Sequence, residues 1–437
     1  MAHRSTHRKE LAFFQETTAC APPASWAVSG TPVEFVSLDL GNVKEALVVD
    51  PTAERRILAN GKRKRIKGIR NVDWSAVFKM HGVGAATATD AQVAETYLSK
   101  ILAWICGGIH RTYTREVASA TNAYTVTVSD GTGYVPGCLV AFEDTTSPSA
   151  QNAGKLHFAR VASIDGDELT LTEALPFTPA SGDVAHGTIT IYVDEDYLED
   201  AIRAGAVRTW SWFAKLHKSG TDELWNLQGC VGSFALQNLS RGQLPQIAVN
   251  ILAANFLHGG ADGLTSPTFG TPQGKPQLSM GLDVRASIGE YGSTTRGNVD
   301  INTAAFEQPG FTRVRVEAGT QEIHRFDGMS TYSVAPGQTK FTATVLPYED
   351  SWYEGLADGT EYRISYYQPG PGGSAGASAG KAWALHIPRA QLVATPGRVD
   401  VNEVHGAALD FEAMIADDAT GGSLPELEQS PFLIGLA

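Results

Sequence analysis

The chain is poor in cysteine, and its cysteines form no recognisable site. Among its 437 residues there are four, Cys20, Cys106, Cys138 and Cys230, with no CxxC pair and no histidine at metal-ligand spacing. This pattern is typical of reduced thiols in a protein made inside a cell. We therefore expect no metal and no cofactor.

Long apolar runs and basic charge are also scarce. The longest uncharged apolar run, residues 101–109, is about half as long as a bilayer span. The N-terminal stretch is charged and has no apolar region behind it, so we expect no signal peptide and no membrane partner. The net charge of -13, from 34 basic and 47 acidic residues, argues against a dedicated nucleic-acid binder and suits a soluble protein.

Catalytic motifs are weak. Residues 376–380, GASAG, match the nucleophile-elbow formula around Ser378, but that motif requires a preceding strand and a following helix. Here it lies in a Gly-, Ser- and Ala-rich loop that precedes an expected strand. Gly82-Val83-Gly84 resembles a dinucleotide loop, yet Thr87 stands where its third glycine belongs. We expect no enzymatic activity.

The most informative stretch is 229–255, which predicts a long β-hairpin. Phe234 and Leu236 alternate with small or polar residues, and Ile247, Val249 and Ile251 do so after a turn that contains Gly242 and Pro245. Polar residues recur along it, so we expect one face to stay wet. The candidate positions on that face are Ser233, Gln237, Asn238 and Asn250.

A second stretch repeats this pattern. Residues 382–394 predict a strand, 395–404 a turn and 406–416 a returning strand, in which Asp410 and Glu412 alternate with Leu409, Phe411 and Ala413. Two long hairpins, each polar on one side, indicate a duplicated unit.

The predicted fold class is mainly β: a β-sandwich or barrel with long hairpins, one packing α-helix per unit and an inserted small β-barrel. In the first unit, Trp74, Ala76, Phe78 and Met80 share one face of a strand, and a helix capped at Thr89-Asp90 extends to Ile105. The second unit predicts strands at 340–346 and 361–367 around a short helix at 348–356. The predicted domains are 1–112 with 194–260 (first unit), 113–193 (inserted barrel), 261–278 (linker) and 279–437 (second unit).

The most basic stretch runs from Lys62 to Arg70. Its six basic residues are Lys62, Arg63, Lys64, Arg65, Lys67 and Arg70. A solvated loop or strand edge, where lysines prevent aggregation, is the first interpretation. A docking surface for an acidic patch on a neighbouring subunit is the second. A phosphate-binding role is the third.

Taken in order, several stretches resemble the major tail tube proteins of long, flexible-tailed bacteriophages. The resemblance is carried by the N-terminal stretch at 7–24, the strand and helix at 72–84 and 97–108, the hairpin at 227–256 and the closing hairpin and tail at 386–435. It covers most of the chain except the barrel at 113–193.

The resemblance implies a virion tail protein, made in the host cytoplasm, whose hairpins join neighbouring sheets into a barrel around a channel. Rings of this kind stack into a tube that conducts DNA and the tape-measure protein. A duplicated chain needs three copies for a pseudo-sixfold ring, whereas a one-domain chain needs six. The resemblance also implies a tail terminator and a distal tail protein as partners. We expect the polar hairpin positions to face the lumen and net negative charge to keep the lumen from gripping DNA.

Two other classes of protein remain open. A phage baseplate or surface protein that recognises carbohydrate would require an exposed aromatic cluster. A β-sandwich hydrolase would require paired carboxylates that face a cleft.

Overall fold

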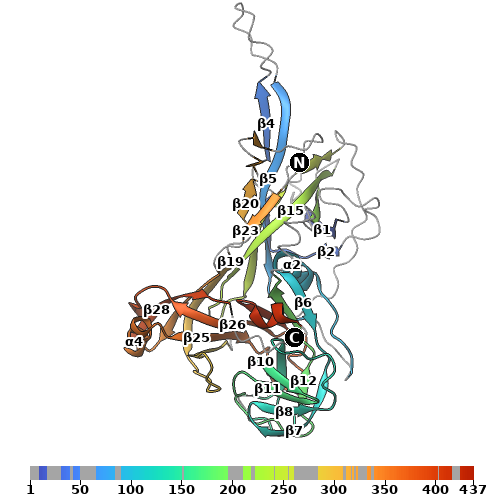
Figure 1. Ribbon diagram of the computed structural model, residues 1–437. Coiled ribbons are helices and arrows are strands. Elements are labelled where there is room, and N and C mark those ends of the chain that lie inside the picture. The colour runs from blue at the N-terminus through green and yellow to red at the C-terminus, as the bar shows by residue number, and fades with distance from the viewer. Residues whose placement is uncertain are drawn as a thin grey trace, which may run out of the picture.

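The structure is a computed structural model that describes most of the chain (Figure 1). The described residues are 9–16, 31–39, 43–49, 65–83, 90–149, 152–194, 210–217, 222–240, 242–253, 255–259, 284–308, 312–315, 317–318, 321–322, 332–335, 339–401, 403–415 and 424–437. The predicted linker at 261–278 lies outside them.

The described part is mainly β, as predicted, with a large antiparallel sheet system and a separate closed barrel. The elements of the first half, outside the barrel, are β1 (Lys9–Gln15), β2 (Thr31–Val33), β3 (Ser37–Asp39), β4 (Val43–Val49), β5 (Arg65–Lys79), α2 (Tyr97–Cys106), β6 (Gly107–Arg111), β13 (Ile189–Val193), β14 (Trp210–Leu216), β15 (Glu223–Gln237), β16 (Gln246–Ala253) and β17 (Asn255–His258).

The second half continues the same sheet system. Its elements are β18 (Arg285–Glu290), β19 (Asp300–Gln308), β20 (Thr312–Arg315), β21 (Glu317–Ala318), β22 (Gln321–Glu322), β23 (Tyr332–Ala335), β24 (Lys340–Leu346), α4 (Ser351–Asp358), β25 (Glu361–Gln368), β26 (Trp383–Leu392), β27 (Gly397–Val401), β28 (Val404–Ala413), α5 (Pro425–Gln429) and β29 (Leu433–Leu436). The predicted strands at 340–346 and 361–367 are thus confirmed as β24 and β25.

The two halves repeat one order of antiparallel pairing. In the first half β1 pairs with β14, β14 with β15, β15 with β16, β16 with β5 and β5 with β4. In the second half β18 pairs with β25, β25 with β26, β26 with β28, β28 with β24 and β24 with β19. A helix follows β5 in one half and β24 in the other. The repeated unit seen in the sequence therefore has a counterpart in strand topology.

The first predicted hairpin is confirmed, and the second is longer than predicted. β15 and β16 pair from Val231 opposite Leu252 to Gln237 opposite Gln246. Residues 397–401, predicted as part of a turn, instead form β27, which pairs with β28 up to Val401 opposite Val404. The alternation of valines in this stretch favours a strand. The chain reverses between Val401 and Val404, where Glu403 has a φ of 68°.

Helix α2 starts later than predicted. Its N-cap is Thr96, whose side chain accepts a hydrogen bond from the Ser99 amide, while the Ser99 hydroxyl accepts one from the Thr96 amide. Asp90, predicted as part of the cap, pairs with Arg115 instead. The Asp90 amide donates to the Thr114 carbonyl, and Asp90 has a φ of 68°, so the chain is not helical at this residue. Helix α4 covers the predicted short helix with a small shift toward the C-terminus.

Both helices pack on the same face of the sheet. In α2, Trp104 lies against Gly232 of β15, on the side of the strand that carries Phe234. In α4, the Trp352 ring lies 5.7 Å from Tyr362, which in turn lies 5.7 Å from Phe411 of β28. One hydrophobic cluster runs beneath both helices and through both halves.

The inserted barrel closes on itself at one end of the molecule (Figure 1). Its strands are β7 (Arg115–Asn122), β8 (Thr125–Val128), β9 (Leu139–Glu143), β10 (Leu156–Asp165), β11 (Glu168–Leu171) and β12 (Val184–His186), in the closed order β10-β11-β8-β7-β12-β9. All six lie within the predicted range 113–193. The strands that flank it, β6 and β13, pair with each other, and β13 also pairs with the C-terminal strand β29.

Candidate functional site

The hairpins of the two halves lie in one continuous sheet. The joint is an antiparallel pairing between β15 and β19, in which Phe234 lies opposite Gln308 and Leu236 lies opposite Phe306. From this joint the sheet continues through β16 and β5 to β3 and β4 on one side, and through β24 and β28 to β27 on the other.

One face of this sheet is apolar across both halves. A single row of side chains crosses six strands in register, and every member is at most 1% exposed. The row consists of Phe78, Ile247, Leu236, Phe306, Phe341 and Phe411. Because side chains alternate along each strand, the neighbours of these residues in the chain point to the opposite face.

The opposite face holds the predicted polar positions of both hairpins. Ser233 lies opposite Asn250, and Asp410 lies opposite Thr342. Asn250, Asp410 and Gln237 are exposed, and Ser233 and Glu412 are half-buried. Since the joint places both hairpins in one sheet, these five residues share one surface, which we call the polar face.

Asn238 does not belong to the polar face. It follows the last residue of β15 and has a φ of 58°, a left-handed conformation that asparagine tolerates in turns. Its side chain is exposed, but it forms part of the turn between β15 and β16. The prediction that placed it with the other hairpin positions is corrected.

The described polar face is not strongly charged. Lys79 ends β5 opposite Gln246, and Lys340 lies opposite Glu412. Lys79 and Lys340 are thus basic groups on this face, and Asp410 and Glu412 are acidic ones, so the two signs of charge occur in comparable number among its described side chains. The surface is therefore hydrophilic without the dense positive charge that grips phosphates.

The predicted basic loop is in part a strand. Arg65, Lys67 and Arg70 belong to β5 and lie opposite Val49, Leu47 and Glu45 of β4. Lys62, Arg63 and Lys64 lie outside the described residues. The β4–β5 hairpin projects from the end of the molecule opposite the barrel (Figure 1).

The two weak catalytic motifs have structural roles. Ser378 is fully buried, and its hydroxyl donates a hydrogen bond of 2.5 Å to the Gly154 carbonyl beside the barrel. The Gly376 amide donates to the Glu143 carboxylate in β9. Gly82 packs so closely that a Cβ there would collide with the Ala437 carbonyl and with Gly380. Ser378, Gly376 and Gly82 thus allow separate segments of the chain to pack against one another.

Trp74 of β5 and Trp212 of β14 are core residues. Trp74 and Trp212 are 3% and 0% exposed, and their rings lie 5.1 Å apart.

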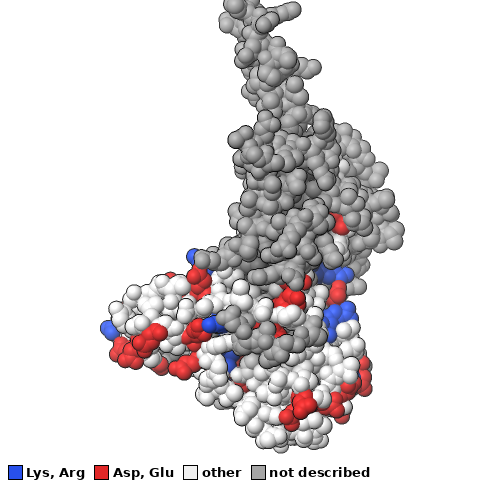
Figure 2. All heavy atoms as spheres, in the orientation of Figure 1, with Lys and Arg blue, Asp and Glu red and all other residues white. Residues whose placement is uncertain are grey.

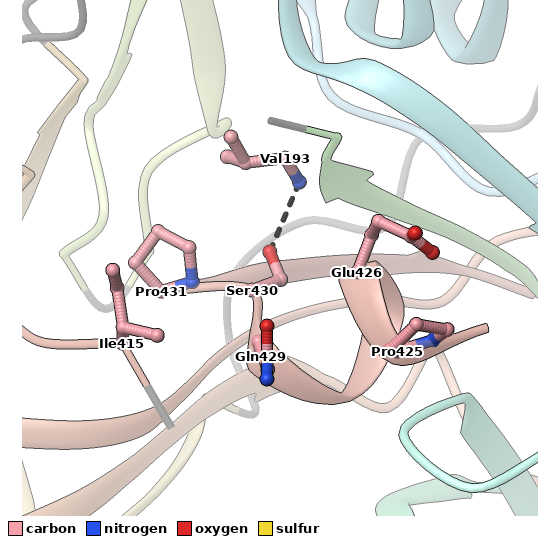
Figure 3. Close-up of a pocket in the computed structure, with 7 residues that line it drawn as sticks. All are labelled: Val193, Ile415, Pro425, Glu426, Gln429, Ser430 and Pro431. Atoms are coloured by element: carbon pink, nitrogen blue, oxygen red, sulfur yellow. Dashed lines mark hydrogen bonds between the residues drawn. The ribbon is translucent and has the colours of Figure 1, made fainter. Parts of the chain in front are cut away.

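A pocket of about 230 Å³ lies where β13 meets α5, and the Ser430 hydroxyl accepts a hydrogen bond from the Val193 amide at its wall (Figure 3). The described residues that line it are Val193, Ile415, Pro425, Glu426, Gln429, Ser430 and Pro431, and Glu426 is the one carboxylate among these.

A buried ionic cluster, which sequence reasoning missed, connects the barrel to the second half. Glu173 of the barrel is fully buried and lies 3.1 Å from the Arg296 guanidinium and 3.7 Å from that of Arg363. The Ser365 hydroxyl donates to Glu173 and lies 2.8 Å from His386 Nδ1. Burial lowers the pKa of His386 far below its usual value, so this imidazole is neutral.

This cluster is suited to holding the barrel in place. Arg363 also donates to the main-chain carbonyls of Thr172 and Ser293, and Arg296 donates to that of Phe158. The bonds to Thr172 and Phe158 thus cross from the barrel to the second half. Isolated acidic and basic residues far apart in the sequence give no pattern from which such a cluster is predicted.

Within the described part of the chain, no group of three or more His, Cys, Asp or Glu side chains is arranged to hold a metal ion. None of the described helices has the length and apolar character needed to cross a bilayer. No known protein-family model matches the chain, and no curated protein has a significantly similar sequence.

Proposed function

We propose that this chain is a structural subunit of the tail tube of a long, flexible-tailed bacteriophage, and that it assembles into stacked rings around a channel. The observation that carries the proposal is the continuous sheet with its two different faces. Long hairpins from both halves contribute to it, and both helices cover its apolar face. The resemblance in sequence order supports the same function.

The two faces fit the two sides of a tube wall. The apolar face packs against helices and core on the outside of the wall. The polar face, with Gln237, Asn250 and Asp410 exposed, lines an aqueous channel. A closed barrel also removes the unpaired strand edges that an isolated sheet would present.

The repeated topology favours three chains per ring. Each chain supplies two sets of strands joined at β15 and β19, so three chains supply six sets.

The channel conducts DNA and the tape-measure protein without specific binding, since its described lining is hydrophilic and mixed in charge. In the view of Figure 2, acidic side chains gather over α4 and the barrel, and exposed Glu349, Asp350, Glu354 and Asp358 flank or belong to α4.

The two alternative classes have less support. Among the described residues, Tyr353 is the one aromatic side chain that is largely exposed, whereas a carbohydrate-binding surface requires several exposed aromatic side chains close together. A hydrolase would require paired carboxylates, and among the described residues that line the pocket beside α5 Glu426 is the one carboxylate.

The test is the assembly state of the purified chain, measured by negative-stain imaging and by mass in solution. Rings or tubes with a central hole and three chains per ring are expected. Six chains per ring would retain the tube and remove the duplicated arrangement. A chain that stays monomeric, alone and with preformed tail-tip complexes as initiators, would overturn the proposal.

A further inference from the structure

The joint between the two halves provides a template for a joint between chains. Within the chain, the outer edge of β15 receives β19. The repeated order of pairing gives each strand of one half a counterpart in the other half. The counterpart of β15 is β26 together with β27, because each precedes the return strand of a long hairpin, β16 in the first half and β28 in the second. β3 continued by β4 corresponds to β19, because both pair with the strand that precedes a helix.

Both counterpart edges are open in the described part of the chain. β27 pairs with β28 alone, and β3 and β4 each pair with β5 alone. They lie at the two opposite ends of the continuous sheet. An unpaired edge at each end, of complementary kind, suits head-to-tail addition of copies and closure into a ring.

The main-chain groups of β27 face this open edge at defined residues. The Tyr348 amide donates to the His405 carbonyl, so the main chain of His405 points toward β24. Asp400 lies opposite His405, and the main chains of these two residues are therefore not hydrogen-bonded to each other, although their side chains are. The amide and carbonyl of Asp400 point away from β28, and the same holds two residues earlier at Arg398.

Exposed aliphatic side chains gather near both edges. Val36 precedes β3 and is 45% exposed; Val393 and Val404, on either side of β27, are 52% and 46% exposed. These three make up most of the five large hydrophobic side chains that are exposed in the described residues. Their cover by a neighbouring chain would add apolar burial to the main-chain hydrogen bonds of a new strand pair.

We propose that β27 of one chain pairs, antiparallel, with the β3–β4 edge of a second copy of this chain, and so repeats the β15–β19 joint between molecules. This inference rests on the proposed ring assembly and names the two edges that form it.

The experiment compares Arg398→Pro with Arg398→Ala. Proline removes the outward amide of Arg398 without removing a hydrogen bond of the β27–β28 pair, and it is tolerated at a strand edge. Alanine removes the same side chain, including its contact with the Tyr348 ring, and keeps the amide. The wild-type and Arg398→Ala chains are expected to form rings, while Arg398→Pro remains a folded single chain by circular dichroism and mass, with ring yield reduced at least tenfold.

Amide hydrogen exchange on the wild-type chain gives a second measurement that needs no variant. The amides of Arg398 and Asp400 are expected to exchange rapidly in the single chain and slowly in rings, together with amides of β3 or β4. Normal rings from Arg398→Pro, or equal exchange at these amides before and after assembly, would overturn the assigned edges and leave the tube function standing. A wild-type chain that forms no rings, either alone or with preformed tail-tip complexes as initiators, would overturn the tube function itself.

Discussion

Leu236 of β15 and Phe306 of β19 lie directly opposite each other, and this pair joins the two halves of the chain in one sheet. Both side chains are at most 1% exposed. The Phe306 ring lies 5.8 Å from Phe234 and 5.1 Å from Phe432, a residue next to the C-terminal strand. The joint is therefore a packed core contact as well as a main-chain pairing.

Phe306→Ala is expected to destabilise this joint strongly. Truncating a fully buried phenylalanine leaves a cavity and costs about 3–5 kcal/mol. The midpoint of urea denaturation, followed by tryptophan fluorescence, checks the loss. Thr303→Ala, an exposed residue of the same strand, is the matched control and should change stability by less than about 0.5 kcal/mol. Equal midpoints for the two variants would contradict the packing described for Phe306.

Glu173→Gln is expected to loosen the barrel from the second half. The change leaves the buried guanidiniums of Arg296 and Arg363 without their carboxylate, and breaking such a buried arrangement costs about 3–5 kcal/mol. Hydrogen exchange should increase at the amides of Leu156 and Ala174, which donate to carbonyls of the second half. Asp165→Asn, exposed on β10, is the control and should leave this exchange unchanged. Unaltered protection in Glu173→Gln would show that the cluster does not hold the barrel.

Acid should destabilise the fold through buried histidines, which include His157 and His81 as well as His386. Burial lowers the pKa of His157 to about 3 and that of His81 to about 4, from an unfolded value of 6.5. The unfolded chain therefore binds more protons below pH 6.5. The stability contributed by each neutral histidine is complete above pH 6.5 and falls as pH decreases toward the folded pKa. At pH 5 the loss is roughly 1–2 kcal/mol for each.

The check is the free energy of unfolding at pH 7.5 and at pH 5 for the wild-type chain and for His157→Gln. His157 Nδ1 lies 3.1 Å from the Tyr367 hydroxyl, so glutamine keeps a polar partner there. The variant should lose less stability between the two pH values than the wild type. An identical loss in both chains would exclude His157 as a source of the acid sensitivity.

The local pattern of the sequence predicted the hairpins, but it did not predict the joint between them. The alternation of Phe234 and Leu236 with polar residues has the period of a half-buried strand, so β15 could be recognised from its own residues. The partner of its outer edge is set by pairing between distant segments, which has no periodic signature. Pro396-Gly397 also favoured a turn, although the valines that follow continue the strand as β27.

The same distinction applies to the candidate site. Ser233, Asn250 and Asp410 could be assigned to wet faces from alternation alone, whereas their common surface depends on the Leu236–Phe306 register. Asn238 shows where alternation stops, since a left-handed turn begins there. Glu173 could not be predicted as a buried residue from its local sequence, because its burial depends on arginines from the second half of the chain.

The charge of the polar face determines how a channel lined by it treats DNA. The combined variant Asp410→Lys with Glu412→Lys adds two basic side chains where acidic ones stand, on a face that already carries Lys79 and Lys340. Rings of this variant should bind double-stranded DNA with an affinity that falls steeply with salt, by about 0.9 in the log–log slope for each phosphate neutralised. Fluorescence anisotropy of labelled DNA at several salt concentrations measures that slope.

The matched control is Asp410→Asn with Glu412→Gln, which removes the acidic charge and adds no positive charge. It should bind DNA no more tightly than the wild type if the low density of basic side chains, and not the presence of acidic ones, keeps the polar face from holding DNA. Tight binding by the control would instead show that Asp410 and Glu412 repel DNA actively. Absence of binding by the lysine variant, in rings confirmed by imaging, would mean that the polar face does not line the channel.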